Sequence, residues 1–187
     1  MDTKEKIITI ATKILTNEGH KSLTTARLVE ETGISKGGIY HHFESIDEIF
    51  FTVAKNITSE LTMAFSELEF KDINHFHSVL IDFAFDDFQE QKVLYSSLLY
   101  FISNTSCDDK YKGLLQEWLN NSIEEWANVY AKKFNIKISK SRLDEVCRMI
   151  DMHFCGLVVH RILIEDCYAY KKTTKTFFKM IMAEYFS

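Results

Sequence analysis

A glycine turn between two short amphipathic stretches most restricts what this chain can fold into. It lies between Thr24 and Phe43, in the segment TTARLVEETGISKGGIYHHF. Thr24 can cap a first short helix, because a threonine hydroxyl accepts from amides that a helix start leaves unpaired. Gly33 can end that helix, since glycine adopts the left-handed conformation that a helix stop favours. The segment therefore predicts a helix-turn-helix whose second helix is capped by Ser35.

The second helix combines an inward side with an outward side that suits DNA. Ile39 and Phe43 are expected to point inward. Lys36 supplies a cation, and the tyrosine and histidine side chains can donate to phosphate oxygens. A helix-turn-helix places its second helix in the major groove, so this side predicts DNA binding. The outward residues are Lys36, Gly37, Gly38, Tyr40, His41 and His42.

The adjacent glycines Gly37 and Gly38 require a reason, since each weakens a helix by roughly 1 kcal/mol relative to alanine. Close approach of the backbone to base edges or sugars is one such reason. The alternative is a small helical hairpin with a packing glycine pair and no ligand, because this geometry also occurs as plain structure.

The rest of the chain also favours helices. Its 187 residues contain no proline and only six glycines. The spacing of apolar residues predicts a first helix over about 4–18 and a long fourth helix that begins at Asp47 and Glu48. Later helices are expected over about 73–88, 93–104, 110–134, 141–164 and 173–186. We predict an all-α fold, with a three-helix DNA-binding domain over residues 1–46 and a helical domain over residues 47–187.

The net charge of −5 does not by itself suggest a nucleic-acid partner, because phosphate binding favours a basic surface. Residues 1–46 are neutral, with six basic and six acidic residues, so the remainder carries the excess of 21 acids over 16 bases. Lys4, Lys6 and Arg27 are expected to add positive potential near the motif. Charge therefore permits DNA binding and predicts modest non-specific affinity.

Other classes of protein have weaker signals. No run of about 18 apolar residues predicts a membrane span, and no secretion signal is visible, so a cytoplasmic location is expected. No glycine-rich phosphate loop, serine elbow or HExxH pattern predicts an enzyme, and no cofactor is predicted. Four cysteines without CxxC spacing indicate reduced, buried thiols. Cys147, Asp151 and Cys155 share a helix face, so a metal-binding or redox-sensing protein is an alternative hypothesis.

The order and spacing of residues over about 4–51 resemble the N-terminal domain of the TetR (tetracycline repressor) family of bacterial transcription factors. The resemblance lies in the helix IITIATKILTNEG, a threonine-initiated helix, the segment GISKGGIYHHF and the acidic start DEIF. It implies a dimeric repressor that a small effector releases from a palindromic operator. The DNA contacts it implies are Thr25, Arg27, Ser35, Lys36, Gly37, Tyr40, His41 and His42.

Four positions depart from the family pattern. Ile46 stands where the family usually has a phosphate-contacting lysine, and Glu44 stands where a basic residue is common. Val29 and Thr32 replace alanines that are often found in the second helix. The fold should survive these changes, but a weaker grip on phosphate is expected.

The resemblance also implies functions for the C-terminal domain. The final two helices would pair with their symmetry mates, and the nearly all-apolar segment 152–164, MHFCGLVVHRILI, suits a helix covered on several sides. A monomer with a buried central helix is the alternative. By analogy with the family, an effector site of largely apolar character is expected, although plain core packing is the commoner role of such residues. The candidate effector-binding residues are Phe83, Phe101, Trp118, Asn121, Met152 and His153, and Tyr95 is a further polar candidate.

Overall fold

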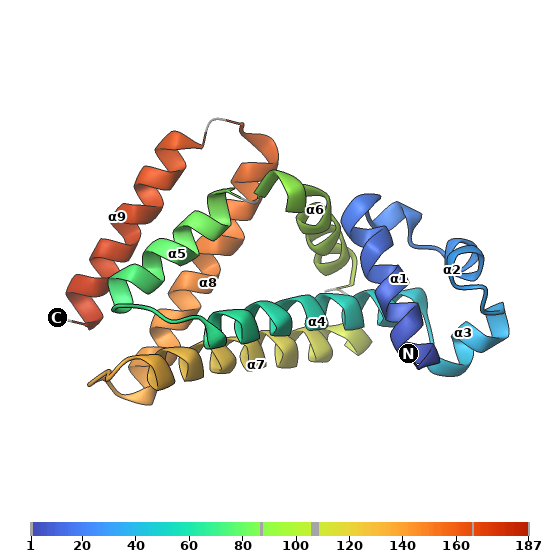
Figure 1. Ribbon diagram of the computed structural model, residues 1–187, viewed down its shortest axis with the longest axis horizontal. Coiled ribbons are helices and arrows are strands. Elements are labelled where there is room, and N and C mark those ends of the chain that lie inside the picture. The colour runs from blue at the N-terminus through green and yellow to red at the C-terminus, as the bar shows by residue number, and fades with distance from the viewer. Residues whose placement is uncertain (1, 87, 106–108, 166, 187) are drawn as a thin grey trace. The chain divides into compact units, whose positions relative to one another are not determined.

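The computed structural model describes residues 2–86, 88–105, 109–165 and 167–186, and these residues form helices without any strand (Figure 1). This confirms the predicted all-α fold. Cys107 and most of the predicted polar break at 106–109 lie outside the described residues. The elements are α1 (Thr3–Asn17), the 3₁₀ turn η1 (His20–Ser22), α2 (Thr25–Thr32), α3 (Lys36–His42), α4 (Ile46–Glu67), α5 (Ile73–Asp86), α6 (Phe88–Thr105), α7 (Asp109–Lys133), α8 (Lys140–Leu163) and α9 (Tyr168–Tyr185).

Helix ends differ from the prediction where capping decides them. Asp2 caps α1, because its side chain accepts from the Thr3 amide while its own amide donates to Glu5 Oε2 at 2.9 Å. The helix therefore begins one residue before the predicted start. The start of α9 at Tyr168 precedes the predicted one by five residues, since no capping side chain marks it in the sequence.

The described residues form two compact units. The first comprises Met1–Ser59 and Gln91–Gln116, and the second comprises Glu60–Glu90 and Glu117–Ser187. Helix α4 thus contributes to both units, and α6 joins the first unit although it follows α5 of the second. The compact units divide within α4, between Ser59 and Glu60. The boundary after Ile46 between a DNA-binding and a C-terminal domain stays a prediction.

The core of the first unit forms where the apolar stripe of α1 meets the helix-turn-helix. Ile7, Leu15, Leu28 and Ile39 are fully buried there. Helix α6 packs on the turn after α1, where the His20 amide donates to Ser97 Oγ at 3.0 Å and the His20 ring stacks on Tyr100 at 3.7 Å. Close packing at this turn follows from Gly19, whose φ of +84° favours glycine.

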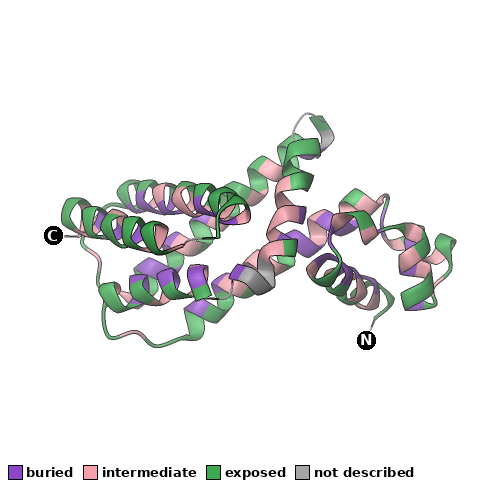
Figure 2. Ribbon diagram, turned by 90° about the horizontal axis from the view of Figure 1, so that it is seen from above, coloured by how far each residue is buried: buried purple, intermediate pink, exposed green. Residues whose placement is uncertain are grey.

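Aromatic rings from α4, α5, α7 and α9 dominate the core of the second unit. The rings of Phe65 and Phe76 meet edge to face at 6.0 Å, and Phe76 and Tyr130 meet at 4.9 Å. Figure 2 shows how buried and exposed residues alternate along these helices, as amphipathic helices require. In the part of the chain that the structure describes, no helix is long and apolar enough to cross a membrane.

Candidate nucleic-acid interface

Capping and a glycine turn fix the path of the helix-turn-helix. Thr24 Oγ1 accepts from the Arg27 amide at 3.2 Å, and Gly33 ends α2 with a φ of +68°. Both features were predicted from the sequence. The sequence did not predict the hydrogen bonds of Thr32. Its hydroxyl donates to the Leu28 carbonyl at 2.6 Å and accepts from the Ile34 amide at 3.1 Å. This buried threonine therefore ties the end of α2 to the turn.

Helix α3 is anchored on one side and open on the other. Ser35 Oγ caps it by accepting from the Gly38 amide at 3.1 Å. Ile39 is fully buried, and Phe43 is 2% exposed, so both inward predictions are confirmed. The outward positions Lys36, Gly37, Tyr40 and His41 are exposed, and Gly38 and His42 are half-buried. This arrangement presents a short helix side with donors and no carboxylate, which suits an anionic partner.

The two glycines of α3 have different neighbours. A Cβ placed on Gly38 would lie 2.7 Å from Ile34 Cγ2, so internal packing excludes a side chain there. A Cβ on Gly37 would meet nothing nearer than Ser35 Oγ at 4.0 Å. Packing within the described chain therefore explains Gly38 but does not explain Gly37. Close approach of the Gly37 backbone to an external surface stays a prediction.

Tyr40 links α3 to the start of α2. Its hydroxyl shares a hydrogen bond of 2.8 Å with Thr25 Oγ1, and the Lys36 ammonium lies 6.0 Å from the centre of its ring. The rings of His41 and His42 meet edge to face at 5.1 Å. Thr25, Lys36 and Tyr40 thus come together on one exposed surface, as the predicted DNA contacts require.

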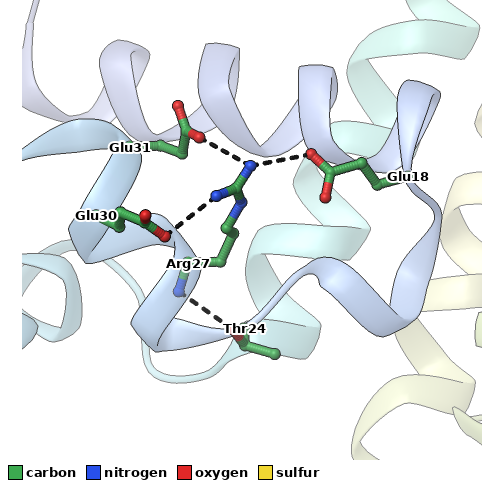
Figure 3. A network of polar contacts seen from close by, with 5 residues as sticks. All are labelled: Glu18, Thr24, Arg27, Glu30 and Glu31. Carbon is green, nitrogen blue, oxygen red and sulfur yellow. Dashed lines mark hydrogen bonds and ion pairs between the residues drawn. The ribbon is translucent and has the colours of Figure 1, made fainter.

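Arg27 lies among carboxylates instead of offering a free cation (Figure 3). Its guanidinium is 2.9 Å from Glu31 Oε1, 3.1 Å from Glu30 Oε2 and 3.3 Å from Glu18 Oε1. The hydrogen bonds to Glu30 and then Glu18 raise the pKa of the guanidinium. Because three anions surround one cation, Arg27 does not give this region the positive potential that the sequence suggested.

The start of α4 is acidic and internally bonded. Ser45 Oγ accepts from the Glu48 amide at 3.1 Å, and the Glu44 amide donates to Glu48 Oε2 at 2.6 Å. Glu44, Asp47 and Glu48 place negative charge where a basic residue would help bind phosphate. A weaker grip on phosphate stays a prediction.

The six predicted effector-binding residues belong to both compact units. Phe101 belongs to the first unit, where it stacks on Phe50 at 4.5 Å. The other five belong to the second unit. There, Asn121 is exposed, Met152 is 71% exposed and Trp118 is half-buried.

Two of these residues pack within the second unit. Phe83 meets Phe65 edge to face at 5.8 Å, which makes it part of the aromatic core. His153 shares a hydrogen bond of 3.0 Å with Thr174 Oγ1 and stacks on Phe177 at 4.2 Å, so it joins α8 to α9. Of the six, Phe83 packs against the hydrophobic core of the second unit. An effector role for the set stays a prediction.

A buried polar pair that sequence reasoning missed lies in the same core. His77 Nε2 and the Tyr130 hydroxyl are 2.7 Å apart, and both side chains are almost fully buried. Burial lowers the pKa of His77 to about 4 and raises that of Tyr130. His77 lies at an inward helical position among phenylalanines, and the apolar pattern of α5 alone does not identify its partner.

On the cysteine face of α8, Cys147 is buried as predicted, but Cys155 is exposed, and Cys167, which lies after α8, is half-buried. Burial raises the pKa of the Cys147 thiol to about 12 and that of Cys155 to about 11. Burial also raises the pKa of Asp151. Thiols with such pKa values are protonated at neutral pH, and the protonated form is a poor nucleophile and metal ligand. These values weigh against the metal or redox alternative.

Comparison with known proteins finds the same N-terminal motif. Residues 7–53 match the profile described as "Bacterial regulatory proteins, tetR family". The nucleoid occlusion factor SlmA of Mannheimia succiniciproducens is 32% identical over 90 residues, which are 44% of this chain and 42% of that protein. The transcriptional repressor AcnR of Corynebacterium efficiens is 28% identical over 67 residues, which are 36% of each chain. The chain therefore spans less than half the length of these curated relatives.

Solved structures extend the likeness to nearly the whole fold. A transcriptional regulator from Rhodococcus sp. Rha1 superposes with a TM-score of 0.73 over 98% of each chain, at 14% sequence identity. At that identity the likeness concerns the fold alone. The sequence match thus covers the N-terminal motif, and the structural match covers the fold of nearly the whole chain.

Proposed function

We propose that this chain is a homodimeric repressor that a small effector releases from DNA. The premise is that the chain belongs to the TetR family of bacterial regulatory proteins and is a DNA-binding transcriptional regulator. The exposed side of α3 is the observation that carries this proposal. Lys36, Gly37 and Tyr40 lie there without internal packing that would explain Gly37. The fold and the relatives are those of regulators and not of enzymes.

The proposed reading unit inserts α3 into the major groove. In this arrangement Lys36 and His41 reach phosphate or base edges, and Gly37 lets the helix backbone approach the groove wall. The hydrogen bond between Thr25 and Tyr40 holds both hydroxyls in position, and the hydroxyl that accepts in this bond keeps its own hydrogen to donate to the flanking phosphate backbone. The Ser35 cap fixes where α3 begins.

A second copy of the chain is the proposed partner of α8 and α9. Met152, Gly156, Val159 and Leu163 form an exposed stripe on α8, since they recur at helical spacing. Nothing lies within 4 Å of a Cβ placed on Gly156, so the close helix approach that this glycine permits is unused within the described residues. A second exposed, uncharged stripe lies on α9 and consists of Ala169, Thr173, Thr176, Met180 and Ala183. A two-fold dimer would bury both stripes and match a palindromic operator.

The proposed effector is a small, largely apolar molecule that binds the second unit. The support for this is the aromatic core around Phe65, Phe83 and Trp126, whose rings meet edge to face. Such an effector releases DNA only if it binds the non-binding conformation more tightly, because equal affinity for both states shifts nothing.

Selection of DNA by the protein tests the core of this proposal. Random-sequence duplexes are enriched on the wild-type protein, and binding of the enriched duplex is then compared with Lys36→Ala and Tyr40→Ala. We expect each variant to bind about tenfold more weakly, a loss of about 1.4 kcal/mol. Lys137→Ala, an exposed lysine outside the motif, is the matched control and should bind like the wild type.

Two results would contradict this proposal. Failure of the wild-type protein to enrich any duplex at low salt would favour a helical small-molecule-binding protein that keeps the motif as a scaffold. Equal binding by all four proteins would show that a surface other than α3 contacts the DNA.

A further inference from the structure

The side chain of Arg27 joins the end of α1 to α2. Its Nη2 lies 3.3 Å from the carboxylate of Glu18, the residue that follows the last turn of α1 and whose amide still bonds the Ile14 carbonyl. Between Glu18 and α2 the chain turns at Gly19 and forms η1. The contact between Arg27 and Glu18 therefore closes this loop and fixes α2 against α1 (Figure 3).

The terminal nitrogens of Arg27 already have partners. Nη1 contacts Glu30, and Nη2 contacts both Glu18 and Glu31. The planar guanidinium suits such contacts, because it presents several donors in a fixed fork. A phosphate contact would require Arg27 to leave at least one of these carboxylates. The cluster as a whole carries an excess of two negative charges, which repel a phosphate backbone.

A contact close to Arg27 links the orientation of α2 to that of α3. Thr25, two residues before Arg27, shares its hydrogen bond with Tyr40 of α3. The Arg27 amide also donates to the Thr24 cap, so the main chain and the side chain of Arg27 both hold the start of α2. A displacement of α2 would therefore alter the position of two proposed DNA contacts.

We infer that Arg27 is a positioning residue for DNA recognition and not a phosphate contact. It holds α2 to the end of α1 and partly neutralises Glu18, Glu30 and Glu31, which would otherwise repel DNA. This inference rests on the proposed DNA-binding function. It changes the role that the family resemblance implied for Arg27 from a contact to a support.

Rescue by removal of the acids distinguishes the two roles. The enriched duplex is titrated at several salt concentrations with the wild type, Arg27→Ala, and Arg27→Ala combined with Glu18→Gln, Glu30→Gln and Glu31→Gln. We expect Arg27→Ala to bind about tenfold more weakly, because three carboxylates are left without a cation, and its salt slope to stay near that of the wild type. The combined variant should recover part of the lost affinity, because the repulsion is removed while the link between α2 and Glu18 is not restored. Lys36→Ala is the comparison, and its salt slope should be smaller by about 0.9 for each phosphate that the variant no longer neutralises.

The inference is overturned if the combined variant binds as weakly as Arg27→Ala and its salt slope falls by about 0.9 per phosphate. It is also overturned if Arg27→Ala binds like the wild type. Thermal melting confirms that each variant is folded, and Arg27→Ala with Glu18→Gln alone replaces the combined variant if that one unfolds. In that pair, partial recovery supports the inference and no recovery overturns it. Failure of the wild type to bind any duplex is a separate outcome that removes the proposed function itself.

Discussion

Gly37 and Gly38 are adjacent residues of α3 with different surroundings, and substitution separates their roles. We expect Gly37→Ala to leave the melting temperature unchanged or raise it, since alanine favours a helix by about 0.5–1 kcal/mol and the site is open. Its affinity for the enriched duplex should fall about tenfold, because the new methyl group would separate the backbone from DNA.

Gly38→Ala is the matched comparison. We expect it to destabilise the fold by about 1–3 kcal/mol, because its Cβ would lie 2.7 Å from Ile34 Cγ2. Thermal melting and DNA titration of both variants measure the difference. Unchanged DNA affinity in Gly37→Ala would show that Gly37 does not approach DNA.

Single residues also show where sequence reasoning succeeds and where it stops. Thr24, Gly33 and Ser35 were predicted correctly because capping depends on neighbours within three or four residues. The environment of Arg27 was not predicted, since Glu18 lies nine residues earlier across a turn. The position of Arg27 beside Glu18 depends on how η1 folds, and no periodic sequence pattern predicts a three-residue 3₁₀ turn.

At the scale of elements, the second unit holds a neutral histidine where α5 meets α7 and α9. The pKa of His77 is lowered to about 4, so the unfolded chain binds more protons than the folded one between about pH 4 and pH 6.5. The contribution of neutral His77 to the free energy of unfolding is therefore fully present above pH 6.5 and is lost as the pH falls toward 4. The expected loss is about 3 kcal/mol in the free energy of unfolding.

Urea unfolding at pH 7.5, 6 and 4.5 measures this loss. His77→Gln should flatten the dependence in this range, whereas His75→Gln, an exposed histidine on the same helix, should retain it. An equally steep dependence in His77→Gln would assign the loss to other groups.

Elements differ in how far the sequence predicts them. The order of the helices followed from apolar spacing and from the absence of proline. The packing of α6 on the turn at Gly19 and His20 did not, because the contact between His20 and Ser97 joins residues 77 positions apart. The candidate DNA-contacting side was largely predictable, since most of its residues lie on the short helix α3. The candidate effector residues come from helices far apart in sequence, and the structure divides them between the two units.

At the scale of the whole molecule, the proposed dimer makes its own prediction. The wild type should sediment as a dimer, and Val159→Glu should sediment as a monomer, because a buried carboxylate without a partner is strongly unfavourable. Binding to a palindromic duplex should then weaken by about tenfold or more, as only one reading head acts at a time. Leu119→Glu, at an exposed position on α7, is the control and should remain dimeric. A dimeric Val159→Glu variant would place the interface elsewhere.

The first compact unit is discontinuous along the chain, which bears on how the protein is made. Leu94, Ser97 and Phe101 of α6 are buried in that unit, yet they follow the helix-turn-helix by some fifty residues. A ribosome that has just completed the reading helix has not yet produced these side chains, and synthesis proceeds from the N-terminus. Until α6 emerges, the nascent first unit therefore lacks the cover that Phe101 gives Phe50. Completion of the first unit is in this sense a late event of translation, although most of its residues are among the first to be synthesised.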